Sequence, residues 1–193
     1  MVNDGLSNAI DSQHVYRNGS SELQAPLGIL SGSFNPIHPG HRSMAQLAEN
    51  MLGCSVEFEL SVKNVDKPDL DRVEIERRLA QFSEREVVWI TWSSTFQQKA
   101  AVLPPCTFVI GADTLIRIAD PRYYPCESGL NDSVDELAER GNRFLVFGRE
   151  VNGSFLGLES IPLPTKLRPL CQAVPESSFR MDISSTGLRP DPP

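Results

Sequence analysis

Five short runs of apolar residues along the chain have the length and residue types of β-strands. In the second run, apolar residues alternate with Glu57, Glu59 and Ser61, which predicts a strand with one polar face. The other runs are almost continuously apolar, as in strands that are buried on both faces. The runs are residues 27–30, 56–62, 87–91, 107–110 and 143–147.

The segments between these runs carry apolar residues at helical spacing. In the first segment, apolar residues from Met44 to Leu52 recur at i, i+3, i+4, i+7 and i+8, and Gly53 is placed to end the helix. The predicted helices are residues 44–52, 71–82, 95–103, 113–118 and 134–140.

The alternation of strands and helices, with short connections, predicts an α/β fold built on a parallel sheet with right-handed crossovers. We expect an open, mostly parallel sheet of five or six strands with helices on both faces. The polar residues 1–26 predict a flexible N-terminal tail, residues 27–189 form the expected domain, and residues 190–193 are a short C-terminal tail. Turn residues over 121–133 predict a surface loop, and residues 156–174 show no clear period.

At 193 residues, with 40% apolar and 22% charged residues, the chain fits one globular domain. No apolar run approaches the ~20 residues that span a bilayer, and the N-terminus lacks the pattern of a signal peptide. We therefore expect a soluble, cytoplasmic protein with no membrane partner. The four cysteines are widely spaced, which argues against a zinc site. The net charge of −7 argues against a nucleic-acid partner but allows small phosphorylated ligands. The sequence does not decide whether the chain forms a homo-oligomer.

Polar, charged and aromatic residues of unusual type follow each predicted strand. The carboxyl ends of parallel strands meet at one edge of a sheet, and open α/β sheets bind their ligands there. We therefore expect these residues to converge on one face. They are Ser31–His41, Lys63, Lys67, Trp92, Thr95, Asp113 and Arg149.

The segment Ser31–His41 has the features of a phosphate-binding loop. It follows the strand at 27–30 and precedes a helix, an arrangement that offers free backbone N–H groups and a favourable dipole to an anion. His38 and His41 add donors for phosphate oxygens. A loop with two surface histidines and no ligand is the alternative, disfavoured because two of the chain's three histidines fall within this short window. Arg149 is a further candidate for a phosphate contact, unless it lies only in a turn.

The segment Ile183–Arg189 is a second candidate for phosphate binding. Consecutive hydroxyl groups at a helix start cap the helix and donate to phosphate oxygens, and an arginine one turn later adds a planar charged fork. Capping alone is the alternative. The chain then ends in Pro190-Asp191-Pro192-Pro193, so we expect the cap to rest on about one turn of helix and to hold a triphosphate weakly. The residues concerned are Ser184, Ser185, Thr186 and Arg189.

The run from Gly32 to His41 resembles the HxGH signature of the nucleotidylyltransferase superfamily, and its Phe-Asn-Pro-Ile-His spelling is most similar to the nicotinamide/nicotinate mononucleotide adenylyltransferases. Residues 183–189 resemble the ISSTxxR motif of the same superfamily, which contacts the β- and γ-phosphates. The resemblance implies a Rossmann-like fold and ATP as co-substrate, and it gives the catalytic role to His38 and His41. Its nucleotide-binding residues in the first motif are Gly32, Ser33, Phe34, Asn35 and Gly40.

Three shorter segments resemble other parts of the same family's site. Gly111-Ala112-Asp113 is similar to the segment that lines the nucleotide site, although Asp113 is also placed to be an ordinary helix N-cap. Trp92, with Thr95, is similar to the aromatic segment that stacks on a pyridine ring, and packing at the rim is the alternative. Lys67 resembles the family's lysine in a Lys-Pro pair, and a solvated surface charge is the alternative.

The resemblance implies nucleotidyl transfer, in which a substrate phosphate attacks the α-phosphorus of ATP and pyrophosphate leaves. This reaction needs aligned and neutralised polyanions rather than a protein nucleophile. It also implies Mg²⁺, held mainly by substrate phosphates. The leading hypothesis is an adenylyltransferase for nicotinate or nicotinamide mononucleotide in NAD biosynthesis. The alternatives are a cytidylyltransferase or phosphopantetheine adenylyltransferase, and a catalytically idle nucleotide-binding module.

Overall fold

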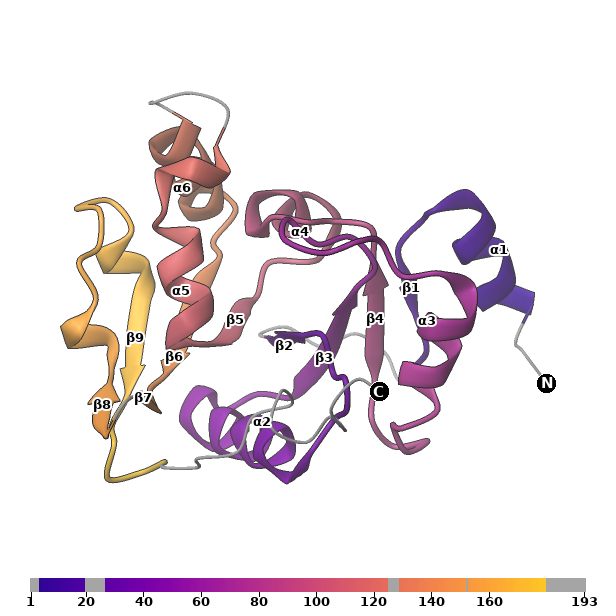
Figure 1. The fold of residues 1–193 in the computed structure, drawn as a ribbon, viewed down its shortest axis with the longest axis horizontal. Helices are drawn as coiled ribbons and strands as arrows, with labels where there is room; N and C mark the ends of the chain where they lie inside the picture. The colour runs from indigo at the N-terminus through magenta and orange to yellow at the C-terminus, as the bar shows by residue number, and fades with distance from the viewer. Residues whose placement is uncertain (1–3, 20–26, 125–128, 152, 180–193) are drawn as a thin grey trace.

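The computed structural model describes residues 4–19, 27–124, 129–151 and 153–179. Its centre is a seven-stranded sheet with the strand order β1-β4-β3-β2-β5-β6-β9 (Figure 1). All neighbouring strands are parallel except β1 and β4. The strands are β1 (Tyr16–Arg17), β2 (Gly28–Gly32), β3 (Val56–Ser61), β4 (Val88–Thr91), β5 (Thr107–Gly111), β6 (Arg143–Phe147) and β9 (Cys171–Val174).

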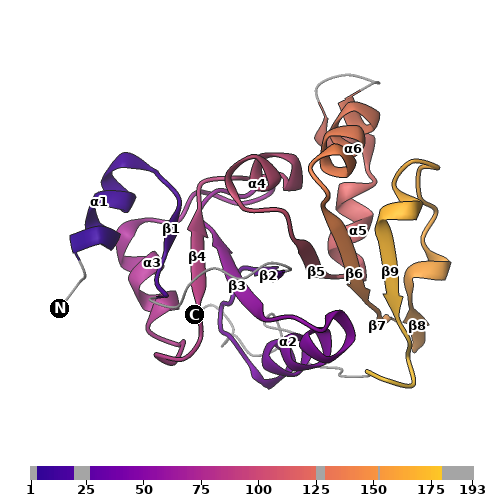
Figure 2. The same ribbon diagram turned by 180° about the vertical axis from the view of Figure 1, so that it is seen from behind.

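Helices cover both faces of this sheet, and Figures 1 and 2 show α2 on the opposite side from α4 and α6. The α-helices are α1 (Asp4–Ser12), α2 (Pro39–Leu52), α3 (Arg72–Leu79), α4 (Phe96–Val102), α5 (Ala112–Ile118) and α6 (Gly129–Glu139). The remaining described elements are 3₁₀ turns at Pro121–Tyr123, Leu158–Ser160 and Arg168–Leu170, and a hairpin of β7 (Arg149–Val151) and β8 (Ser154–Leu156). None of the described helices is long and apolar enough to cross a membrane.

Alternating side chains of the strands enter two separate cores. Ile29 and Phe108 pack with buried residues of α4, α5 and α6 on one face. Leu30 and Phe58 pack with Ala48 of α2 on the other face. Burial on both faces explains why most strands read as continuous apolar runs, because neither face of such a strand meets water.

The predicted Rossmann-like α/β fold is confirmed, and all five predicted strands are present. Two further strands, β1 and β9, extend the sheet at its edges. Helix α6 begins at Gly129, earlier than the predicted start at 134, so the end of the predicted loop over 121–133 is helical. Leu130, Val134 and Leu137 are buried at helical spacing and account for the longer helix.

The expectation of a flexible tail over residues 1–26 is wrong for residues 4–19. Leu6 and Ile10 of α1 pack against a small core that contains Ile75 and Ile90. Strand β1 then pairs antiparallel with β4, and Nε of Arg17 donates to the Glu57 carboxylate at 2.9 Å. The polar composition of the segment conceals the i, i+4 apolar pair, which docks together with the buried Ala9 and the ion pair of Asp11 with Arg72.

The second strand has the polar face that the alternation predicts, but this face is buried. Glu57 and Glu59 are only 6% and 0% exposed. Trp89 Nε1 donates to Glu57 at 2.6 Å, and Lys99 Nζ donates to Glu59 at 2.7 Å. Thus the two carboxylates face the α4 side of the sheet and are buried because each has charged and neutral donors from distant parts of the chain.

The strand order reverses between β2 and β5. From β2 the chain proceeds through β3 and β4 in one direction, and from β5 it proceeds through β6 and β9 in the other. The connections after β2 and β5 therefore diverge and leave a crevice between them at the carboxyl ends of the strands. Such a reversal is where open α/β sheets bind ligands.

Candidate active site

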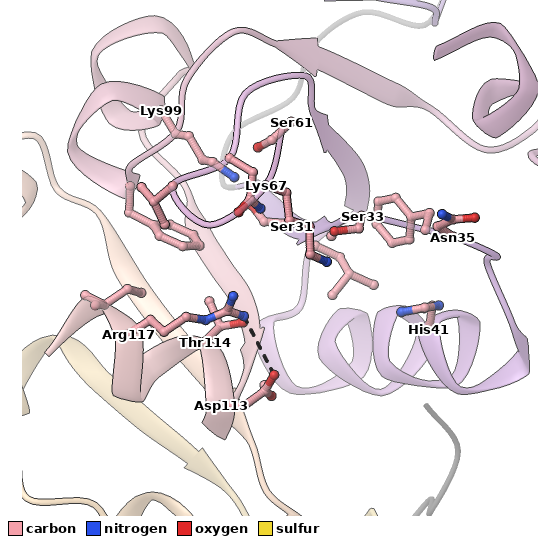
Figure 3. Close-up of a pocket in the computed structure, with 18 of the residues that line it drawn as sticks. Ser31, Ser33, Asn35, His41, Ser61, Lys67, Lys99, Asp113, Thr114 and Arg117 are labelled. Carbon is pink, nitrogen blue, oxygen red and sulfur yellow. Dashed lines mark ion pairs between the residues drawn. The ribbon is translucent and has the colours of Figure 1, made fainter. Parts of the chain in front are cut away.

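A cavity of about 740 Å³ opens at this reversal, lined by the segments that follow β2, β3, β4, β5 and β6 (Figure 3). Most of the candidate site residues, which lie far apart in the sequence, therefore surround this one cavity. The predicted site residues that line it are Gly32, Ser33, Phe34, Asn35, His38, Gly40, His41, Lys67, Thr95, Gly111, Asp113 and Arg149. The predicted residues Ser184, Ser185, Thr186 and Arg189 lie outside the described part of the chain.

The loop between β2 and α2 folds over a buried aromatic ring. Phe34 is 1% exposed, has a φ of 45°, and packs edge-on against Phe58, Phe82 and the His41 ring. A Cβ on Gly32 would lie 2.8 Å from the Phe34 ring, closer than carbon atoms approach. The phenylalanine is therefore an anchor of the loop, and glycine at position 32 leaves room for it.

Helix α3 holds this loop in place through side chains that the sequence analysis did not single out. Arg78 Nη1 donates to the carbonyl oxygen of Ser33 at 2.8 Å. Gln81, just after α3, donates to the Phe34 carbonyl oxygen at 3.2 Å and accepts from the Ile37 N–H at 3.1 Å. These three backbone groups of the loop thus have hydrogen-bond partners outside the loop. Such bonds hold the loop in its conformation without a ligand.

The two histidines of the motif form one unit at the N-terminus of α2. His38 is the N-cap residue, and its backbone N–H donates to Nδ1 of His41 at 3.3 Å. The two rings stack with centroids 3.8 Å apart. Because Nδ1 of His41 accepts this bond, the proton of the neutral His41 ring lies on Nε2. His41 therefore carries an N–H donor on the edge of its ring that is not tied to the backbone.

Burial keeps both imidazoles neutral near pH 7. The pKa of His41 is lowered to about 4, chiefly by burial and to a smaller extent by repulsion from His38 and Arg42. Burial also lowers the pKa of His38. In the absence of an anion the pair therefore consists of two neutral rings at the positive end of a helix dipole.

The opposite wall of the cavity carries a cluster of charges around Asp113. Its carboxylate lies 3.8 Å from Arg117 Nη2 and 4.0 Å from Arg149 Nη1 (Figure 3 shows the Arg117 pair). The N-cap of α5 is Gly111, so Asp113 is not the N-cap. Arg149 begins strand β7 rather than lying only in a turn. All three charged side chains are partly exposed and available to a ligand.

The cavity is basic although the chain as a whole is acidic. Lys63 and Lys67 line it, and neither has an ion-pair or hydrogen-bond partner among the described residues. Arg78 and Lys99 each have a carboxylate partner in Glu74 and Glu59. This local excess of positive charge is the arrangement that a polyanionic ligand requires.

Trp92 is the predicted site residue that the structure keeps away from the described cavity. It packs with the core formed by Val62, Ile75 and Ile90, on the side covered by α1 and α3. Phe96, at the start of α4, lines the cavity instead. The sequence contained the signal for this difference: Trp92 lies two residues after Ile90 and shares its face, away from α4.

The described residues include no group of three or more histidine, cysteine, aspartate or glutamate side chains that would hold a metal ion. Asp113 has a partly exposed carboxylate in the cavity, which is a group that could coordinate a metal ion.

Comparison with known proteins matches residues 29–190 to the cytidylyltransferase-like family. A protein of Schizosaccharomyces pombe named "Putative nicotinamide mononucleotide adenylyltransferase" is 28% identical over 142 residues. That alignment covers 67% of this chain and 55% of the yeast protein, so the chain spans about half the length of this relative.

Proposed function

The chain belongs to the cytidylyltransferase-like family, and on that basis we propose that it transfers a nucleotidyl group from a nucleoside triphosphate to a phosphorylated small molecule. The acceptor phosphate attacks the α-phosphorus, the bond to the β-phosphate breaks, and pyrophosphate leaves. The observation that carries the proposal is the pair of stacked histidines, His38 and His41, at a helix N-terminus that lines a basic cavity.

The donor in this proposal is ATP and the acceptor is nicotinate or nicotinamide mononucleotide. The name of the yeast relative supports this acceptor, as does the Phe34–His38 spelling of the motif. Phe96 supports it in a different way, because an aromatic wall in the cavity suits a planar ring.

The residues act by binding and charge stabilisation rather than by covalent catalysis. His41 donates through Nε2–H to the phosphoryl oxygens as negative charge develops there, and His38 holds its ring in that orientation. Lys67 neutralises the acceptor phosphate, and Arg149 and Arg117 face the nucleotide. Ser184 and Arg189 of the second motif remain proposed ligands of the leaving pyrophosphate.

Magnesium fits this scheme as an ion bound mainly by phosphate oxygens, with Asp113 as a protein carboxylate that lines the cavity. When bound, it would neutralise phosphate charge and orient the triphosphate. The protein's own contribution is to place the two polyanions in line between the α2 wall and the Asp113 wall.

A second candidate uses CTP as the donor, and the cytidylyltransferase-like match favours it. One experiment separates the two. Pyrophosphate release is measured with Mg²⁺ and either ATP or CTP, against nicotinate mononucleotide, nicotinamide mononucleotide and phosphopantetheine, with His41→Ala as the blank. We expect release with ATP and a pyridine mononucleotide. Release with CTP alone would assign the second function, and ATP binding without release from any acceptor would favour an idle nucleotide-binding module.

A further inference from the structure

A buried ion pair, of which one member lines the cavity, has no part in the mechanism described above. Lys99 Nζ donates to Glu59 Oε2 at 2.7 Å, and their side chains are 7% and 0% exposed. The other carboxylate oxygen, Oε1, accepts from Thr91 Oγ1 at 2.5 Å and from Ser61 Oγ at 2.9 Å. Glu59 thus accepts from three donors, and both of its carboxylate oxygens are bonded.

Lys99 is satisfied only in part. An ammonium group has three N–H donors, and Glu59 is its one hydrogen-bond partner among the described residues. The ammonium also lies 4.8 Å from the centre of the Phe96 ring. Both Lys99 and Phe96 line the cavity, whereas Glu59 does not. The N–H groups of Lys99 that do not bond Glu59 would therefore meet an acceptor in the cavity.

The groups beside Lys99 in the cavity are a second cation and hydroxyls rather than carboxylates. Figure 3 shows the Lys99 amino group directed toward the part of the cavity where Lys67 and Ser61 lie, with Asp113 further away across the opening. Lys67 is exposed and has no partner among the described residues. Glu59 is 0% exposed and does not line the cavity, so it offers no acceptor to a ligand. A ligand group at this end must supply acceptors, and an anionic group does so best.

We propose that Lys99 determines acceptor specificity, because its ammonium group binds a carboxylate on the acceptor's head group while Phe96 covers the ring that carries this carboxylate. This inference rests on the proposed function and deepens it by naming the substrate class, an acceptor with a carboxylate as well as its phosphate. Glu59 is a positioning residue, which holds Lys99 through their salt bridge.

The alternative is that the ion pair only supports the fold. A buried ion pair is weak evidence for stability, since taking both charges out of water costs about as much as their attraction returns. A structural role would also affect all ligands alike. A specificity role predicts a change in the ratio of affinities for two acceptors that differ only in the head group.

The test compares nicotinate mononucleotide with nicotinamide mononucleotide, which present a carboxylate and a neutral amide on the same ring. Dissociation constants are measured by calorimetry on the full chain, together with the dissociation constant of ATP and, separately, pyrophosphate release. The variants are Lys99→Arg, which keeps the charge, and Lys99→Met with Glu59→Gln, which removes both charges and avoids an unpaired buried carboxylate. Lys166→Met, a lysine on the surface paired with Asp135, is the matched control.

We expect the wild-type chain to bind the acid at least about tenfold more tightly than the amide, the double variant to lose this preference, and ATP affinity to stay within a factor of about two. Lys99→Arg should retain most of the preference, and Lys166→Met should retain all of it. An unchanged ratio in the double variant, a wild-type preference for the amide, or no binding of either mononucleotide would overturn the inference. Selective binding of the acid without pyrophosphate release would support the Lys99 subsite and refute the transferase function, so the two failures are distinguishable.

Discussion

The backbone N–H of His38 donates to Nδ1 of His41, and the two imidazole rings stack on each other. The bond joins the first and fourth residues of the His-x-Gly-His run and fixes which nitrogen of His41 carries its proton. The spacing of the motif is thus a geometric requirement, because only this separation lets the N-cap backbone reach the ring one helical turn later.

His41→Asn should remove transferase activity without unfolding the chain. Asparagine keeps an acceptor near the position of Nδ1 but loses the Nε2–H donor, and loss of one such donor costs about 10²–10³ in kcat. Pyrophosphate release measures the effect, and circular dichroism checks the fold. His14→Ala, an exposed histidine outside the cavity, should have wild-type activity. Full turnover by a folded His41→Asn protein would refute the proposed role.

Stability should fall as the pH is lowered from about 6.5 towards 4. The pKa of His41 is lowered to about 4 in the folded chain, chiefly by burial, so in this window the unfolded chain takes up a proton that the folded chain does not. His41 therefore does not reduce the free energy of unfolding above the pKa of the unfolded chain. Below that pKa the free energy of unfolding falls, by about 2 kcal/mol at pH 5. Urea unfolding at pH 7 and pH 5 measures the loss, and it should be smaller in His41→Asn. An equal loss in both proteins would assign the effect to other groups.

Gln81→Met should weaken catalysis although Gln81 does not line the described cavity. The substitution keeps the side chain's length but removes the bonds to the Phe34 carbonyl and the Ile37 N–H. We expect a loss of about 1–2 kcal/mol in unfolding free energy and a lower kcat/KM for both substrates. Gln46→Met, on the exposed side of α2, is the matched control. Wild-type kinetics in Gln81→Met would show that the loop holds its shape without α3.

Arg17→Met should destabilise the fold by about 3 kcal/mol, because it leaves the buried Glu57 carboxylate without its ion-pair partner. Urea unfolding gives the value. Adding Glu57→Gln should recover part of the loss, since the uncompensated charge is then gone. If Arg17→Met alone has no effect on the unfolding free energy, the segment of residues 4–19 contributes little to the stability of the sheet.

Local patterns in the sequence predicted most of the fold. Continuous apolar runs identified four strands because neither face of these strands meets water, and alternation with polar residues identified the fifth. The period of α2 was visible from Met44 to Leu52. What the local patterns missed depends on partners far away in the sequence. The burial of Glu57 and Glu59 was not predictable because their partners, Arg17 and Lys99, lie 40 residues before and after them.

The candidate site was predictable where a motif marks it and elsewhere only in outline. Histidines, glycines and a strand end near each other are a local signal. The support from Arg78 and Gln81 has no such signal, because ordinary polar residues on a helix usually face water. Trp92 was assigned to the site because it follows a strand. It lies on the other face of that strand, however, where it packs against the core under α1.

The reversal of strand order between β2 and β5 divides the two walls of the crevice between two unbroken stretches of chain. Residues 56–103 supply Lys67, Phe96 and Lys99, and residues 107–150 supply Asp113, Arg117 and Arg149. Lys99 and Asp113 each take their ion-pair partners from their own stretch, whereas Asp66 of the first stretch pairs with Arg117 of the second at 3.4 Å. In the proposed reaction, selection on this scaffold would therefore alter the choice of acceptor largely independently of the choice of nucleotide, as two modules that evolve around one shared phosphate loop.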